Sequence, residues 1–187
     1  MSHVLSFAVA PMMAVGFTFW PAARTGHAGY GLQDGVIIFS AVAWTTGFTQ
    51  LAKGRVSRQR PGYHYGMGGA TEFGEGSEQE NLSFFSGDTS LAFSLIASAA
   101  TVAYLRRYPT APYLAWWGGG VAALTGVLRI AADVHWATDV LVGAAAGTGV
   151  GVALPLLFHS PIGTDSARVL PLPVRNGVGV ALQWPVQ

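Results

Sequence analysis

Five long apolar stretches constrain the fold of this chain more than any other feature. Each approaches the roughly 20 residues that a helix needs to cross a bilayer. Only 10% of the residues are charged and mean hydropathy is +0.40, whereas about 25% of residues in a typical soluble domain are charged. An alternative is a soluble helical bundle with a very apolar core. The sequence predicts an all-α, polytopic transmembrane bundle with about five spans, at residues 4–23, 32–52, 82–105, 112–130 and 137–158.

The stretches are rich in small residues rather than in leucine. Glycine recurs at 118–120, and again at Gly143, Gly147 and Gly151, four residues apart. Residues this small let membrane helices approach closely. The sequence therefore predicts tight helix packing along the last span.

Basic residues outside the candidate site predict the orientation of the spans. If the spans alternate in direction, one side of the membrane receives Arg24, Arg106, Arg107, Arg168 and Arg175. Such an excess marks the cytoplasmic side. The N-terminus, the loop 53–81 and the link 129–135 would then lie outside. An outer N-terminus without a preceding helix suggests that an upstream helix or signal sequence is missing or processed.

Charge and cysteine content exclude several classes of function. The net charge is +1 and the basic residues are bunched in one short loop, which argues against nucleic acid as a partner. The chain has no cysteine, which excludes disulfides, thiolate metal sites and cysteine nucleophiles. Membrane lipids are the expected surroundings. The oligomeric state is left open.

A cation, an imidazole and a carboxylate stand close together in otherwise apolar sequence, as Arg129, His135 and Asp139. Such groups are unfavourable among apolar residues unless they share partners, which suggests an anionic ligand. On a helix that begins near His135, Asp139 lies one turn further and can accept a proton from one ring nitrogen, leaving the other free. The alternative for His135 is an interior histidine whose hydrogen bonds are satisfied.

Two further clusters fit an anion site. Lys53 and Arg60, in KGRVSRQRP, could both point at one anion, although a basic loop end at the membrane interface would look the same. Ser86, Gly87 and Asp88 open the third span in FFSGDTS, where free backbone N–H groups bind phosphate. Ordinary helix capping would also explain this second cluster.

In this order the clusters read KxxxxxxRP, then SG, then RxxxxxHxxxD, and the chain resembles the type 2 phosphatidic acid phosphatase (PAP2) and vanadium haloperoxidase superfamily. The resemblance extends over residues 33–147. It implies a phosphatase that acts on lipid or isoprenoid mono- or diphosphates, in a bacterial inner membrane with its site facing the periplasm. It also implies that the phosphate is bound by Lys53, Arg60, Ser86, Gly87 and Arg129.

The same resemblance assigns the chemistry to the last cluster. His135 would attack phosphorus and form a phosphohistidine that water hydrolyses, while Asp139 orients and charge-stabilises the ring. Three cations and a neutral imidazole backed by a carboxylate fit phosphoryl transfer. No metal or other cofactor is expected, and vanadate would act as a phosphate mimic.

Position 88 departs from the family, which usually has a histidine there to protonate the leaving oxygen. Asp88 takes this catalytic position, and a carboxylate near three cations is expected to be ionised and a poor proton donor. Three outcomes are open: a leaving group that needs little protonation, a proton that Asp88 shares with bound phosphate, or reduced or absent activity. Phe85 and Leu128 also replace the usual proline and serine.

Two other functions compete with a phosphatase. A catalytically impaired member would bind phosphate or phospholipid headgroups without turnover, as Asp88 suggests. A vanadate-dependent haloperoxidase would use the same cations, with His135 as the vanadate ligand, but those enzymes are larger and soluble.

Two segments carry no assigned chemistry. The glycine-rich loop 66–81, with Glu72, Glu75, Glu78 and Glu80, is interpreted as a flexible connector, with a lid as the weaker alternative. Asn176–Gly177 between two short apolar runs predicts a β-hairpin-like C-terminal tail. We therefore divide the chain into a membrane domain at 1–160 and a tail at 161–187.

Overall fold

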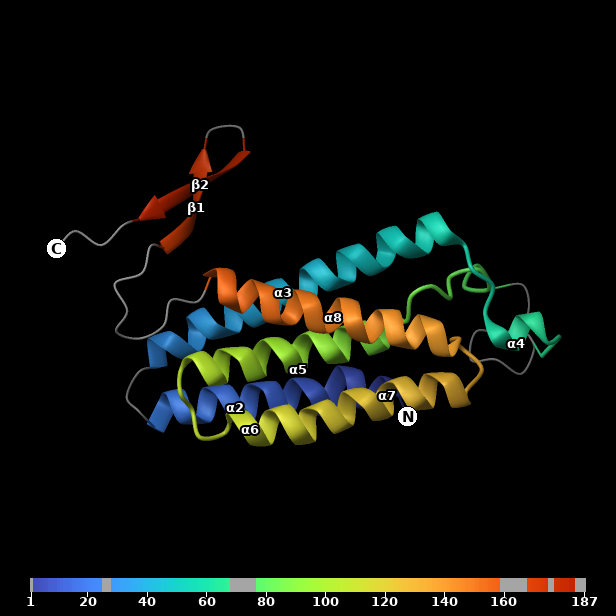
Figure 1. Cartoon of the computed structure of the whole chain (residues 1–187), viewed down its shortest axis with the longest axis horizontal. Helices are drawn as coiled ribbons and strands as arrows, with labels where there is room; N and C mark the ends of the chain where they lie inside the picture. The colour runs from blue at the N-terminus through green and yellow to red at the C-terminus, as the bar shows by residue number, and fades with distance from the viewer. Residues whose placement is uncertain (1, 25–27, 68–76, 159–167, 175–176, 184–187) are drawn as a thin grey trace.

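The computed structural model describes residues 2–24, 28–67, 77–158, 168–174 and 177–183, and these are mostly helical (Figure 1). The helical elements are α1 (Ser2–Val4), the π-helical turn η1 (Leu5–Val9), α2 (Ala10–Arg24), α3 (Ala28–Val56), α4 (Pro61–His64), α5 (Gly87–Leu105), α6 (Ala111–Tyr113), the π-helical turn η3 (Leu114–Gly118), α7 (Gly119–Ala131) and α8 (Ala137–Phe158). Two strands, β1 (Arg168–Val174) and β2 (Gly177–Gln183), pair antiparallel, with Arg168 opposite Gln183.

Five helical segments of the described chain are long and apolar enough to cross a membrane, which confirms the five predicted spans. They are Ser2–Arg24, Tyr30–His64, Gly87–Leu105, Ala111–Ala131 and Ala137–Phe158. The predicted start of the third span at Leu82 is wrong, because residues 82–86 are irregular. Their backbone groups bond to other segments instead: Ser83 N donates to Arg58 O and Ser86 N donates to Asp139 O, at 2.9 and 3.1 Å.

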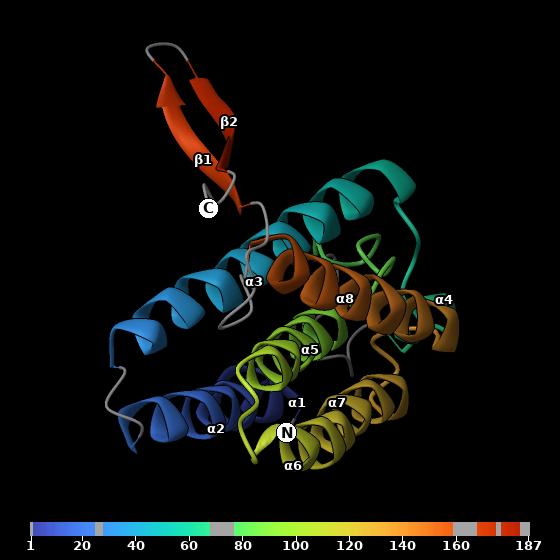
Figure 2. The same cartoon turned by 60° about the vertical axis from the view of Figure 1, so that its left-hand side comes forward.

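Helix α5 occupies the centre of the bundle, with α2, α3, α7 and α8 around it (Figure 2). Its side chains Leu95, Ile96 and Ala99 are in the apolar core. The surrounding helices turn large apolar side chains outward, and Met12 and Trp116 are 73% and 82% exposed. A soluble bundle would leave this apolar surface facing water, whereas lipid covers it in a membrane.

Helices α5 and α8 pack backbone to backbone through the predicted glycine stripe. A Cβ on Gly143 would lie 2.8 Å from Ser86 O, and one on Gly151 would lie 2.6 Å from Ser94 O. A Cβ on Gly147 would overlap Ser90 O. These separations leave no room for a side chain, so the three glycines set the distance between the two helices.

Hydroxyl contacts attach α3 to the other side of α5. Thr45 Oγ1 donates to Ser94 Oγ at 2.9 Å, and the hydroxyls of Thr49 and Ser90 lie 3.0 Å apart, all four buried. Interhelical hydrogen bonds of this kind stabilise helix association where no water competes. Helix α5 is therefore held on both sides.

The two ends of the bundle differ in their polar contacts. At one end a buried ion pair joins Arg106 Nη2 to Asp34 Oδ1 at 2.8 Å. The other end gathers the N-terminal turn α1, the short helix α4 and the connection from α7 to α8 (Figure 1). The candidate site lies at this second end.

Candidate functional site

His135 lies in the connection that precedes α8, and its side chain is almost fully buried. Helix α8 begins at Ala137, two residues after His135, in agreement with the predicted helix start near the histidine. The His135 ring faces Asp139: Nδ1 is 3.8 Å from Asp139 Oδ2. Arg60 Nη1 lies 3.4 Å from Nε2. Because arginine can only donate, Nε2 is the accepting nitrogen and Nδ1 carries the proton that faces the carboxylate.

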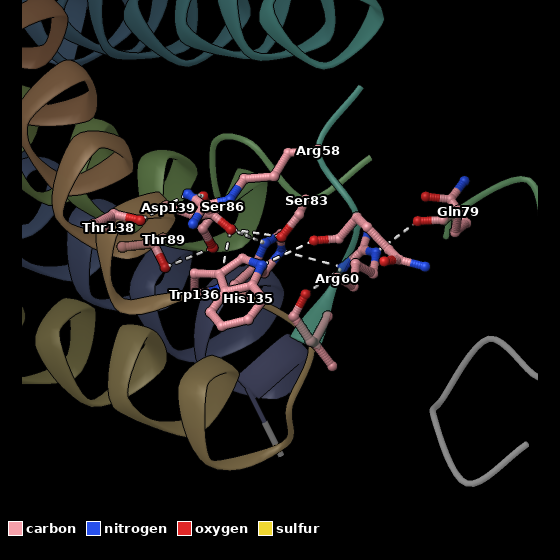
Figure 3. A network of polar contacts seen from close by, with 12 residues as sticks. Arg58, Arg60, Gln79, Ser83, Ser86, Thr89, His135, Trp136, Thr138 and Asp139 are labelled. Atoms are coloured by element: carbon pink, nitrogen blue, oxygen red, sulfur yellow. Dashed lines mark hydrogen bonds and ion pairs between the residues drawn. The ribbon is translucent and has the colours of Figure 1, made fainter. Parts of the chain in front are cut away.

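The Asp139 carboxylate is fully buried and accepts hydrogen bonds from three donors (Figure 3). Ser83 Oγ and Trp136 N donate to Oδ2 at 2.5 and 3.0 Å. Arg58 Nη1 donates to Oδ1 at 2.7 Å. A carboxylate with this many donors is ionised and fixed in orientation, as a partner for a histidine must be.

Arg58 and Trp136 were not identified from the sequence, although both join the basic loop to the start of α8. Arg58 Nη1 also donates to Thr138 Oγ1 at 2.7 Å, and its guanidinium lies 5.3 Å from the Trp136 ring centroid. Trp136 Nε1 donates to Gln59 O at 2.8 Å. KGRVSRQRP contains three arginines, and spacing alone does not show that Arg58 contacts the carboxylate while Arg60 contacts the histidine.

Arg60 is buried and held by backbone carbonyls, which fixes its guanidinium beside His135 (Figure 3). Its Nε donates to Gln79 O at 2.7 Å and its Nη1 donates to Val134 O at 3.1 Å. A guanidinium that is already positioned loses little conformational freedom when it binds an anion. Arg60 is thus suited to hold a phosphoryl group at His135 Nε2.

Lys53 and the start of α5 form another side of the site. Lys53, in the last turn of α3, places Nζ 3.6 Å from the position that a Cβ on Gly87 would take. Ser86 is at the N-cap position of α5 but makes no capping hydrogen bond through its side chain; its Oγ lies 2.8 Å from Thr89 Oγ1. An ammonium group beside an uncapped helix start is an arrangement that binds phosphate.

Arg129 and Asp88 meet at a third side, together with the first residues of the chain. Arg129 Nη1 lies 3.4 Å from Asp88 Oδ2 and 3.3 Å from His3 Nε2. His3 Nδ1 lies 2.9 Å from the same Asp88 oxygen. Ser2 Oγ lies 3.4 Å from Arg129 Nη1. No sequence motif pointed to Ser2 or His3, because more than 80 residues separate them from their partners.

The surroundings of His135 favour the neutral imidazole. Burial lowers the pKa of His135 to about 4, and the interaction with Asp139 opposes this shift. The positive charges of Arg60, Arg129 and Lys53 lower the pKa further. His135 is therefore uncharged near neutral pH and retains the lone pair that a nucleophile needs.

The structure brings the residues of the three sequence clusters to one end of the bundle. Two of the four glutamates in the loop 66–81, Glu72 and Glu75, lie outside the described residues, so the connector and lid interpretations are not tested there. Among the described residues of that loop, Glu80 Oε1 accepts a hydrogen bond from Gln59 Nε2 at 2.8 Å.

Comparison with known proteins gives two matches. A family model described as the PAP2 superfamily matches residues 34–161. Lipid A 1-phosphatase of Porphyromonas gingivalis is 39% identical over 85 residues, which are 43% of this chain and 18% of that protein. The chain thus spans less than a fifth of the length of this relative. No solved structure gives a significant match.

Proposed function

Because the chain belongs to the PAP2 superfamily, we propose that it is a membrane-embedded phosphatase that hydrolyses lipid or isoprenoid mono- or diphosphates. The observation that carries the proposal is the environment of His135, with Arg60 at Nε2 and Asp139 at Nδ1. A buried neutral imidazole oriented in this way is a nucleophile with an anion-binding group at its reactive atom. The similarity to lipid A 1-phosphatase supports a lipid phosphate as substrate.

The proposed reaction has two steps. His135 Nε2 attacks phosphorus, the bond from phosphorus to the leaving oxygen breaks, and a phosphohistidine forms. Water then attacks phosphorus, and the electron pair of the P–N bond returns to Nε2. Asp139, whose Oδ2 faces Nδ1 at 3.8 Å, would stabilise the positive charge that the ring gains during attack.

The cations carry the electrostatic part of the mechanism. The positive charges of Lys53, Arg60 and Arg129 act on His135, and these residues would neutralise the charge that spreads over the phosphoryl oxygens in the transition state. The backbone N–H of Gly87 and the hydroxyl of Ser86 would add hydrogen bonds at the start of α5. This reaction requires no metal, and vanadate would bind at the same place as a phosphate mimic.

An apolar groove beside the site supports a lipid substrate. The groove has a volume of about 320 Å³ and lies between η1, α2, α3 and α5. Its lining includes Phe7, four residues after His3, and Leu91, three residues after Asp88. A phosphate held among the cations would therefore have an apolar surface within reach of its acyl or isoprenoid chain.

The distribution of basic residues supports an orientation with the site facing outward. Arg24 ends α2, and Arg106 and Arg107 follow α5, at the end of the bundle opposite the site. These residues would face the cytoplasm under the positive-inside rule. In a bacterial inner membrane the site would then face the periplasm.

Phosphate release by the purified full chain tests the proposal. Lipid and isoprenoid mono- and diphosphates are supplied in detergent micelles, and inorganic phosphate is measured. We expect release by the wild type and none above background by His135→Ala. Arg107→Ala, an exposed change at the opposite end, is the control. Undiminished release by His135→Ala contradicts the phosphohistidine mechanism.

A second candidate function is binding without turnover, which one contact favours. Asp88 Oδ2 lies 3.4 Å from Arg129, so the carboxylate takes a position on a cation that phosphate would otherwise use. Asp88→His separates the two functions. A large gain of phosphate release from a near-zero background favours the binding protein, whereas strong release by the wild type excludes it.

A further inference from the structure

The proposed reaction needs a proton at the leaving oxygen. An alkoxide is a poor leaving group, and general acid catalysis of its departure typically contributes about 10²- to 10⁴-fold in rate. Asp88 lies at the site, but it is a carboxylate in contact with Arg129, and an ionised carboxylate has no proton to donate. A donor would therefore have to come from another side chain near Asp88.

His3 is in contact with Asp88. Its Nδ1 lies 2.9 Å from Asp88 Oδ2, and its Nε2 lies 3.3 Å from Arg129 Nη1. Arg129 in turn acts electrostatically on His135. The imidazole of His3 thus joins a carboxylate on one side to a phosphate-binding cation on the other.

The contacts fix which nitrogen can reach the substrate. Arg129 can only donate, so His3 Nε2 accepts in this structure, and Nδ1 carries the proton that faces Asp88. A phosphate that binds Arg129 competes for the same Nη1 group and thereby releases His3 Nε2 next to its own oxygens. The side chain of His3 is 51% exposed, so solvent can deliver a proton to Nε2.

We propose that His3, held by Asp88, is the general acid and base of the phosphatase reaction. His135 Nε2 forms the bond to phosphorus, the leaving oxygen takes the electron pair of the broken P–O bond, and the proton of His3 Nε2 moves to that oxygen. In the second step His3 Nε2 takes the proton of the attacking water, and His135 regains its lone pair. The net reaction is phosphate ester plus water to alcohol plus phosphate.

Asp88 is a positioning residue in this scheme. It lies against the Nδ1 side of the His3 ring and would fix the direction of Nε2, as Asp139 does for His135. Ser2 and His3 precede residues 34–161, which match the family model. The acid therefore comes from a part of the chain outside the matched region.

The inference rests on the proposed phosphatase function, and the acidity of the leaving group tests it. Values of kcat/KM are measured for a long-chain alkyl phosphate, which needs a proton on departure, and for a nitrophenyl phosphate, which does not. We expect His3→Ala to lower kcat/KM about 100-fold for the alkyl ester and less than about tenfold for the aryl ester. Equal losses on both esters, or none, overturn the inference.

Two variants separate acid catalysis from a structural role. His3→Gln keeps a polar side chain for Asp88 but supplies no acid, and we expect the same selective loss as for His3→Ala. Recovery of alkyl ester hydrolysis in His3→Gln contradicts proton donation. Met12→Ala, an exposed change on α2, is the matched control for alterations near the N-terminus.

A double substitution tests the pairing with Asp88. His3→Ala combined with Asp88→Asn is expected to lose no more alkyl ester activity than His3→Ala alone, because both act through one group. Losses that multiply indicate independent roles and overturn the pairing.

The ester panel also separates failure of the two proposals. If the wild type releases phosphate from none of the esters, the phosphatase proposal fails. If the wild type is active but His3→Ala shows no selective loss on the alkyl ester, only the assignment of His3 fails.

Discussion

Arg58 and Asp139 form a 2.7 Å ion pair that involves only one oxygen of the carboxylate. The other oxygen, Oδ2, accepts hydrogen bonds from Ser83 and Trp136 N and faces His135. The carboxylate is therefore anchored without help from the histidine. Such anchoring suits the role proposed for Asp139, which is to support the ring throughout the reaction.

Removal of Arg58 should weaken both the fold and the proposed activity. Arg58→Ala removes the cation that donates to Oδ1 of the buried Asp139, and a hydrogen bond to a charged group typically contributes about 2 kcal/mol. We expect a lower thermal midpoint in detergent and a fall in kcat of about tenfold. Arg55→Ala removes an exposed cation from the same segment as a control. If the two variants behave alike, the ion pair has no special role.

The lowered pKa of His135 predicts a specific pH dependence of stability. The unfolded chain binds a proton at this residue near pH 6.5, whereas the folded chain does so only near pH 4. Between these values the unfolded state binds more protons, so stability falls as the pH decreases from 6.5 to 4. His135→Gln should lose less stability than the wild type over this interval. Thermal midpoints at pH 7 and pH 4.5 measure the difference.

The glycine stripe of α8 predicts opposite effects for two neighbouring substitutions. A Cβ on Gly147 would overlap Ser90 O, so Gly147→Ala must separate α5 from α8 and should lower the thermal midpoint strongly. Gly149 has nothing within 4 Å of its Cβ position, so Gly149→Ala should be neutral or stabilising by up to about 1 kcal/mol through helix propensity. Equal destabilisation by both substitutions would show that the packing is looser than described.

The apolar groove predicts a dependence on chain length. Val42 lines the groove on α3, so Val42→Trp would fill part of it and should reduce kcat/KM about tenfold for a long-chain substrate. A short, water-soluble phosphate ester should be hydrolysed within about threefold of the wild type. Val36→Trp places the same side chain at a 59% exposed position of α3 and serves as the control. An equal loss on short and long esters argues against a chain site in the groove.

Much of the bundle could be predicted because membrane spans impose simple rules on sequence. Length and apolar content were sufficient for the five spans. The recurring glycines indicated close helix packing along the last span, but not that α5 is the partner helix. The start of the third span was misjudged because Leu82, Phe84 and Phe85 are apolar although their segment is irregular. Hydropathy does not distinguish an apolar loop packed at the site from the helix that follows it.

The site was predictable where its residues are close in sequence. The spacing of His135 and Asp139 predicted that the two side chains face each other. In the structure His135 Nδ1 lies 3.8 Å from Asp139 Oδ2, although the histidine precedes the helix. Arg58 was missed because KGRVSRQRP contains three arginines and their spacing does not show which of them contacts Asp139. His3 was missed because its partners, Asp88 and Arg129, come from distant helices, and only the folded chain brings them together.

The backbone contact between α5 and α8 also limits how a protein of this kind can change its substrate. Gly87 opens α5 and Asp139 lies in the first turn of α8, and Ser86 N bonds directly to Asp139 O at 3.1 Å. Any substitution that separates α5 from α8 would displace the proposed phosphate site and the carboxylate beside His135 relative to each other. New lipid preferences would therefore have to arise on α2 and α3, whose groove-facing side chains can vary without disturbing the alignment of the reacting groups.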